Sequence, residues 1–193
     1  VGVLLAILVN QKDLRFKPLI RTILILPWAV PGFVTILVFA GMFNETFGVI
    51  NNGILASLGI EPKAWMTDPF WTKTALILMQ TWLGFPFVFA MTTGVLQAIP
   101  DDLYEAATID GASTWHKLTT ITLPLVLYSI APIIITQYTF NFNNFNIIYL
   151  FNNGGPAVAG SNAGGTDILV SWIYKLTMSS SQYAIAATIT ILL

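Results

Sequence analysis

The stretch IPDDLYEAATIDGASTWHKLTTITLP, residues 99–124, decides how this chain is organised. It is polar, yet it lies between two long apolar runs, residues 72–97 and residues 122–150. Each run is long enough to cross the hydrocarbon core of a bilayer, which takes about 20 helical residues. The stretch therefore predicts a loop outside the membrane that joins two membrane-spanning helices.

Local signals inside this loop, residues 98–121, predict a helix–turn–helix bracket. Pro100 suits the start of a helix because its missing N–H falls among the unpaired donors of the first turn. Helical spacing continues until Asp110-Gly111 breaks it. A second short helix fits residues 112–121.

The first helix of the bracket exposes small, closely approachable residues. Glu105, Ala106 and Ala107 follow one another there. A bracket with such a surface suits docking into a groove of another protein. A merely solvated loop is the alternative interpretation.

The composition is that of a membrane protein. Hydrophobic residues make up 55% of the 193 residues and charged residues only 9%, with a mean hydropathy of +0.75. An ordinary soluble domain carries about 25% charged residues. The net charge of -1 gives no electrostatic case for nucleic-acid binding. The absence of Cys excludes thiol catalysis and thiolate metal sites.

We interpret residues 1–193 as one transmembrane domain that is cut at both ends. Loops on the outer side are expected at residues 44–71 and 151–166, and a short amphipathic helix with Lys175 as an interfacial anchor at residues 167–180. The expected full and partial spans are residues 1–10, 22–43, 72–97, 122–150 and 182–193.

Prolines within the spans are compatible with tolerated breaks or with kinked helices around a cavity. They are Pro27, Pro31, Pro86, Pro124 and Pro132.

Cations define the orientation. Half of all Lys and Arg residues gather before the first full span, and they are Lys12, Arg15, Lys17 and Arg21. Such a cluster marks the cytoplasmic side of a membrane protein. Two spans separate the cluster from the loop 98–121, so both lie on the cytoplasmic side.

Seven positions of the loop match a known motif, and they are Glu105, Ala106, Ala107, Gly111, Ile121, Leu123 and Pro124. The order is Glu-Ala-Ala, three residues, Gly, nine residues, Ile, one residue, Leu-Pro. With this spacing the stretch resembles the EAA loop of binding-protein-dependent ABC importer permeases. The resemblance implies coupling to a cytoplasmic ATPase through Glu105, Ala106, Ala107, Asp110 and Gly111.

Other stretches resemble the larger permease subunit of maltose and maltodextrin importers. They are LPWAVPGF (26–33), TWLGFP (81–86), FNFNNFN (140–146), NNGGP (152–156) and GTDILVSWIYKL (165–176). The resemblance implies an all-α transmembrane helix bundle with a MetI-like permease core, crossing the prokaryotic inner membrane several times. It also implies a second permease subunit, an ATPase dimer, an extracytoplasmic sugar-binding protein and a sugar substrate. This chain would then be no enzyme and hold no cofactor, because ATP and Mg would bind the ATPase.

Carboxamides interrupt the last full span. At 100° per residue one helical face holds Gln137, Phe140, Asn141 and Asn144. Amides pair with sugar hydroxyls, and an aromatic ring packs on the C–H face of a sugar. Hydrogen bonds between helices are the alternative use of such amides. We expect that second use for Asn143 and Asn146, which point elsewhere.

The preceding span offers a similar face. Its residues at spacing i, i+3, i+4 and i+7 are Gln80, Leu83, Gly84 and Phe87. The resemblance implies sugar contact at these four positions and at the four named above. Three of them depart from the family pattern: Gln80 replaces Asn, Phe87 lacks the hydroxyl of Tyr, and Gln137 replaces a smaller Ser.

Together these features predict a permease subunit of an ATP-driven importer for maltose-type sugars, working by alternating access. Another neutral sugar stays open as the substrate, whereas glycerol phosphate is disfavoured because no full span has Lys or Arg in its middle. A secondary carrier without ATP is a further alternative. Such carriers commonly use intramembrane acids, and no full span contains Asp or Glu. A purely structural scaffold would not need the polar faces.

Overall fold

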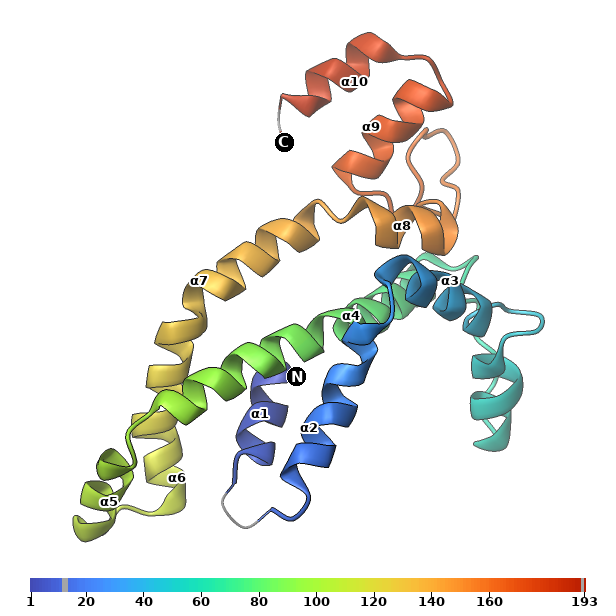
Figure 1. Cartoon of the computed structure of the whole chain (residues 1–193). Helices are drawn as coiled ribbons and strands as arrows, with labels where there is room; N and C mark the ends of the chain where they lie inside the picture. Colours follow the sequence, from blue (N-terminus) through green and yellow to red (C-terminus); the bar gives the residue numbers. More distant parts are fainter. Residues whose placement is uncertain (12–13, 192) are drawn as a thin grey trace. The chain divides into compact units, whose positions relative to one another are not determined.

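The computed structural model describes residues 1–11, 14–191 and 193, so Lys12 of the cation cluster lies outside the described residues. Within these ranges the chain is helical and contains no β-strand, as the sequence predicts (Figure 1). The α-helices are α1 (Gly2–Val9), α2 (Lys17–Ile25), α3 (Gly32–Met42), α4 (Pro69–Ala98), α5 (Asp101–Ile109), α6 (Thr114–Lys117), α7 (Leu123–Phe142), α8 (Phe145–Asn152), α9 (Leu169–Met178) and α10 (Tyr183–Thr190). A 3-10 turn, η1 (Leu26–Ala29), and two π-helical turns, η2 (Ile50–Leu55) and η3 (Leu118–Thr122), accompany them.

Two of the described helices are long and apolar enough to cross a membrane. One is α4, and the other is the continuous helix Thr114–Phe142 formed by α6, η3 and α7. A third span results if Lys17–Ala29 and Gly32–Met42 count as one interrupted span. The amphipathic helix expected at residues 167–180 is present as α9.

The span expected at residues 22–43 is not one regular helix. After α2 the chain forms η1, and α3 starts only after Pro31, which is its N-cap. Pro27 and Pro31 lack the N–H that a helix needs, and each disfavours helical geometry in the residue before it. The two prolines therefore divide the expected span into shorter helices.

The span expected at residues 122–150 begins and ends earlier than predicted. The helix runs without a break from Thr114, so no turn separates the second arm of the bracket from the span. The wider π-helical turn η3 comes just before Pro124 and relieves the clash of its ring with the carbonyl four residues earlier. At the other end, α7 stops at Phe142 and α8 begins at Phe145.

The chain divides into two compact units, residues 1–29 with 82–139 and residues 30–81 with 140–193. In the first unit α1, α4 and α7 share a hydrophobic core of Ala6, Val9, Phe89, Leu96, Val126 and Ile130. Gly2 lets α1 lie directly on α4, since a Cβ there would come within 2.8 Å of a backbone oxygen of α4. The interpretation of the chain as one transmembrane domain stays a prediction.

The second unit is held together by aromatic rings and a buried amide. The ring of Phe43 lies edge-on to Trp65, at 5.0 Å between centroids, and to Phe151, at 6.1 Å. The buried side chain of Asn51 accepts a 2.8 Å hydrogen bond from the Trp65 indole. These contacts order the segment between α3 and α4, which the sequence predicts only as a mixed outer loop.

A carboxylate closes the same segment. One oxygen of Glu45 accepts hydrogen bonds from the backbone N–H groups of Met66, at 2.7 Å, and Thr67, at 2.9 Å. Asn152 at the end of α8 donates to the carbonyl oxygen of Met66 at 2.8 Å. Residues far apart in the sequence are thereby joined in one outer layer of the second unit.

Candidate functional site

The first arm of the bracket is α5, and its bounds agree with the sequence prediction. Pro100 is the N-cap, and Asp101 and Asp102 occupy the first turn. Negative charge is stabilising there because it meets the positive end of the helix dipole. We use the name coupling bracket for residues 101–122.

The turn of the coupling bracket is a Schellman motif. Gly111 has a φ of +78°, the left-handed conformation that glycine adopts without strain. The N–H of Ala112 donates to the Ala107 carbonyl at 2.8 Å, and the N–H of Gly111 donates to the Thr108 carbonyl at 3.0 Å. This pair of bonds satisfies carbonyls at the end of α5 and fixes the direction of the turn.

Side chains tie the two arms together. The ammonium of Lys117 donates to the Thr108 hydroxyl at 2.7 Å, and that hydroxyl donates to the Tyr104 carbonyl at 2.6 Å. The Tyr104 hydroxyl lies 2.9 Å from that of Thr122. The coupling bracket is therefore one braced unit, a feature that the sequence motif does not reveal.

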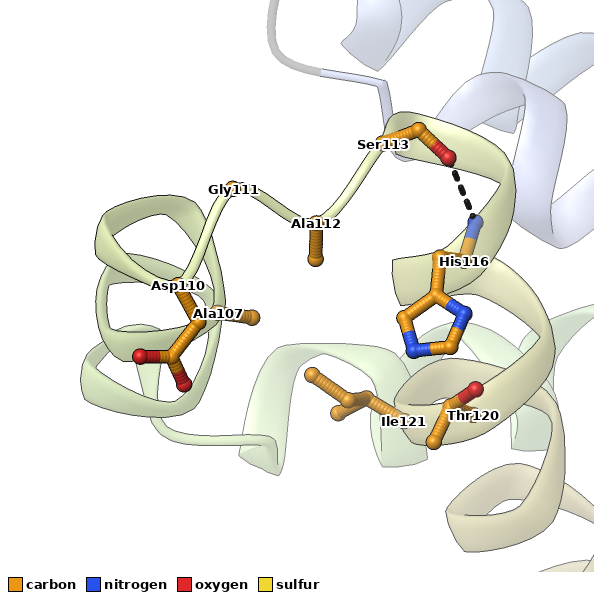
Figure 2. A pocket seen from close by; sticks show the side chains of 8 residues that line it. All are labelled: Ala107, Asp110, Gly111, Ala112, Ser113, His116, Thr120 and Ile121. Atoms are coloured by element: carbon orange, nitrogen blue, oxygen red, sulfur yellow. Dashed lines mark hydrogen bonds between the residues drawn. The ribbon is translucent and has the colours of Figure 1, made fainter.

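The two arms enclose a polar-rimmed groove, shown in Figure 2, with a volume of about 540 Å³. Its lining residues are Ala107, Asp110, Gly111, Ala112, Ser113, His116, Thr120 and Ile121. Ser113 is the N-cap of α6 and accepts a hydrogen bond from the His116 N–H at 3.2 Å. Three of the residues that the sequence assigns to coupling, Ala107, Asp110 and Gly111, thus face one groove.

The other coupling residues lie on the open surface of α5, and a large apolar side chain is exposed on each arm of the bracket. Glu105 and Ala106 are exposed. Ile109 is 87% exposed and Trp115 is 71% exposed. Sequence reasoning missed these two side chains, although a large apolar residue on each side of the Asp110-Gly111 break is a readable signal.

The amides predicted to hold a sugar meet within the second unit. The side-chain amide of Gln80 in α4 donates to the side-chain oxygen of Asn141 in α7. The Asn144 amide donates to the Gln80 side-chain oxygen at 3.4 Å. We call Gln80, Asn141 and Asn144 the amide cluster.

The helical face that groups these residues in the sequence is only partly correct. Because α7 ends at Phe142, Asn144 is not on its face and is instead the N-cap of α8. Within the described residues neither Asn143 nor Asn146 makes a side-chain hydrogen bond, and the helix-to-helix bonds of this region belong to the amide cluster. The expected bonding of these two amides to neighbouring helices stays a prediction.

The other predicted sugar contacts lie on the same two helices as Gln80 and Asn141. Leu83, Gly84 and Phe87 are on α4, and Gln137 and the exposed Phe140 are on α7. The Phe87 ring packs edge-on against Trp28, with centroids 5.8 Å apart. Leu83 and Gly84 are half-buried on α4.

The loop before α9 is anchored by an ion pair. The Lys175 ammonium lies 2.6 Å from the Asp167 carboxylate, and their side chains are only 18% and 1% exposed. Asp167 also accepts a 2.6 Å bond from the Gly164 N–H and a 2.8 Å bond from the Ser171 hydroxyl. Lys175, expected as an interfacial anchor, therefore pairs inside the protein.

Apolar spans joined by a braced polar bracket, with amides set into the helices, define a membrane protein of the transporter permease class. The chain belongs to the family of binding-protein-dependent transport system inner membrane components, which it matches over residues 1–193.

Curated relatives include sugar permeases. The chain is 74% identical over 192 residues to the galactooligosaccharides transport system permease protein GanP of Bacillus subtilis (strain 168), covering 100% of this chain and 46% of GanP. It is 55% identical over 199 residues to the maltodextrin transport system permease protein MdxF of the same organism, covering 100% and 46%. Identity to the maltose/maltodextrin transport system permease protein MalF of Escherichia coli (strain K12) is 44% over 198 residues, covering 100% and 38%. The chain thus spans less than half the length of these relatives.

A solved structure confirms the fold. A bacterial ABC transporter involved in the import of the acidic polysaccharide alginate matches with a TM-score of 0.84 at 24% identity. The match covers 99% of this chain and 65% of the other. The predicted all-α permease fold is therefore confirmed.

Proposed function

We propose that this chain is the membrane-spanning core of a permease subunit in an ATP-driven importer of neutral oligosaccharides. ATP and Mg bind an ATPase dimer on the cytoplasmic side, a second permease subunit completes the pathway, and an extracytoplasmic sugar-binding protein delivers the substrate. A related alginate transporter has been solved in complex with an alginate pentasaccharide-bound periplasmic protein, which supports the last of these partners.

The observation that carries this proposal is the coupling bracket. It presents Ile109 and Trp115, both largely exposed, in a polar segment between two membrane-spanning helices. Ile109 lies in α5 and Trp115 in α6, one on each side of the turn, where a docked protein partner could cover them. A helix that inserts into a groove of the partner is a standard way to bury them. A partner ATPase that accepts α5 would receive Glu105, Ala106 and Ile109 together.

The amide cluster supports a sugar as the cargo. Each carboxamide has two donor hydrogens and two acceptor lone pairs, so the bonds within the cluster leave other positions for hydroxyl groups. Contact with a sugar and bonding between helices are therefore compatible. A neutral cargo fits α7 and residues 74–98 of α4, which contain no charged residue.

Similarity to relatives bears on which sugar is carried. The sequence pattern predicts a maltose-type substrate, but identity is 74% to the galactooligosaccharide permease and 55% to the maltodextrin permease. We therefore place galactooligosaccharides first and maltodextrins second. A secondary carrier is disfavoured because it would have no use for the coupling bracket.

The test is uptake by the full-length permease, assembled with its partner subunits and binding protein in liposomes. We expect labelled galactotriose to accumulate when ATP is present at the ATPase, and maltotriose to accumulate more slowly. Equal accumulation of both sugars without ATP would reject the importer. ATP-dependent uptake of maltotriose alone would keep the importer and reverse the order of substrates.

A further inference from the structure

A second groove is lined by residues of α2 and η1. Its volume is about 430 Å³, and its lining residues are Arg21, Thr22, Ile25, Leu26, Trp28 and Ala29. One end is therefore cationic and polar, and the rest is apolar. None of these lining residues is assigned above to sugar contact or to ATPase coupling.

Arg21 is held at one end of the groove by neutral partners. Its Nη2 donates to the Asn10 side-chain oxygen at 3.0 Å. When the carboxamide of Gln97 turns its oxygen toward the guanidinium, Nη1 donates to it at 2.9 Å. In the described part of the chain no carboxylate pairs with Arg21, and its Nε is buried without a hydrogen-bond partner.

The Arg21 guanidinium is positioned to bind an anionic group. A guanidinium offers five N–H donors in a fixed fork, which matches the oxygens of a phosphate. Two neutral amides orient the fork without neutralising its charge. Because a partly buried charge costs free energy and no described carboxylate pairs with this one, a phosphate group that reaches Arg21 would be stabilised.

The groove continues from this charge along apolar surface. Trp28 follows Arg21 by about 10 Å along the helix axis at ordinary helical rise. Ile25, Leu26 and Trp28 form the wall over that distance, and Leu26 and Trp28 are exposed. Arg21 belongs to the cation cluster that the sequence places on the cytoplasmic side, so the apolar wall extends from that surface into the membrane.

We propose that this groove binds one anionic phospholipid of the cytoplasmic leaflet, with the phosphate at Arg21 and an acyl chain along Ile25 and Trp28. Basic pockets on the cytoplasmic side of membrane helices recognise such headgroups. The proposal uses the orientation of the chain but not the identity of the sugar. The lipid proposal is tested by quenching of Trp28 and the transport proposal by sugar uptake, so a failure of one can be distinguished from a failure of the other.

The test uses quenching of Trp28 by brominated lipid. The full-length permease with its partner subunits is placed in phosphatidylcholine nanodiscs that contain either acyl-brominated phosphatidylglycerol or acyl-brominated phosphatidylcholine. A Trp28→Phe variant gives the fluorescence that comes from the other tryptophans. We expect half-maximal quenching of Trp28 at an about five-fold lower mole fraction of phosphatidylglycerol, the factor for one cationic side chain at an anionic surface.

Matched charge variants separate a site from general attraction. Arg21→Gln should abolish the preference for phosphatidylglycerol. Arg15→Gln removes the same charge from an exposed side chain of the same cation cluster and should leave the preference intact. Equal quenching by both lipids in the unaltered protein, or equal effects of the two variants, would overturn the proposal.

A third variant guards against a folding defect in Arg21→Gln. Ala29→Phe fills the groove without touching the hydrogen bonds of Arg21, and it should lower quenching by both lipids. Complete protection of Trp28 from either lipid would show that a protein subunit covers the groove, which overturns the lipid assignment. Displacement of the lipid by millimolar glycerol 3-phosphate would overturn it too, because the acyl chain would then contribute nothing.

Discussion

The ammonium group of Lys117 lies 2.7 Å from the hydroxyl of Thr108, and this bond joins the two arms of the coupling bracket. The same Thr108 hydroxyl donates to the Tyr104 carbonyl, and the Tyr104 side chain in turn meets Thr122. The contacts join α5 to Lys117 and Thr122 of the continuous helix Thr114–Phe142. A displacement of α5 would therefore be transmitted to α7, because these hydrogen bonds brace the turn between the two arms.

Thr108→Val should weaken coupling more than assembly. It removes the Lys117 bond, and a net loss of about 1 kcal/mol corresponds to an about five-fold shift between braced and open brackets. We expect the ATPase to copurify while the number of sugars moved per ATP falls several-fold. Thr119→Val is the control, since that hydroxyl bonds only to backbone carbonyls of its own helix. An unchanged ratio in Thr108→Val would contradict the bracing role.

Gly111→Val should disrupt the turn through backbone strain alone. A Cβ at Gly111 would meet nothing within 4 Å, so no side chain blocks it. The left-handed conformation costs a β-branched residue about 1–2 kcal/mol or more. We expect reduced copurification of the ATPase and reduced uptake. Gly111→Asn should retain most of the ATPase copurification and most of the uptake, because Asn tolerates this conformation. Equal loss in both variants would contradict the role of backbone strain and would mean that any side chain at this position interferes with the ATPase.

Asn141→Ala separates sugar contact from bonding between helices. A hydrogen bond between membrane helices is worth only about 0.6 kcal/mol on average, so thermal stability should change little. Loss of a sugar hydrogen bond should lower uptake about ten-fold, as expected for about 1.4 kcal/mol. Asn143→Ala removes a neighbouring amide that makes no side-chain hydrogen bond in the described structure. A lower melting temperature with normal uptake per folded molecule would favour the helix-bonding role.

Asp167→Asn should loosen the outer loop in front of α9. The carboxylate is almost fully buried and accepts from Lys175, Ser171 and Gly164. Removing one partner of a buried ion pair costs about 3–5 kcal/mol. We expect faster proteolysis within residues 153–166 of the full-length protein. Glu61→Gln, on an exposed side chain, should leave the cleavage rate unchanged, and equal rates in both variants would argue against an anchoring role.

The coupling bracket could be predicted from the sequence because its signals are local. Pro100 opens α5 and Asp110-Gly111 closes it within one short stretch. The start of the second arm could not be predicted in the same way. The hydropathy pattern changes from polar to apolar within this region and therefore suggests a boundary between two elements. In the structure the backbone continues as one helix from Thr114.

The breaks inside the spans escaped prediction for a different reason. The run containing Asn143 and Asn144 is continuous in hydropathy, and only the backbone reveals that α7 ends before them. The amide cluster was found by an argument that fails for Asn144. Its position next to Gln80 depends on a separate short helix.

The contacts that order the segment between α3 and α4 were not predicted because their partners are distant in the sequence. Glu45 accepts from the Met66 N–H, and Asn152 donates to the Met66 carbonyl. Neither contact has a local pattern, and each requires the folded chain to bring the groups together.

The exposure of Ile109 and Trp115 has a consequence for how a cell must produce this protein. In the proposed assembly, a copy without its ATPase would leave both apolar side chains in contact with water, and exposed apolar surface favours aggregation. Surplus copies would then be sequestered by chaperones or removed by proteases. Synthesis of the two subunits in fixed proportion would shorten the time that these side chains stay exposed.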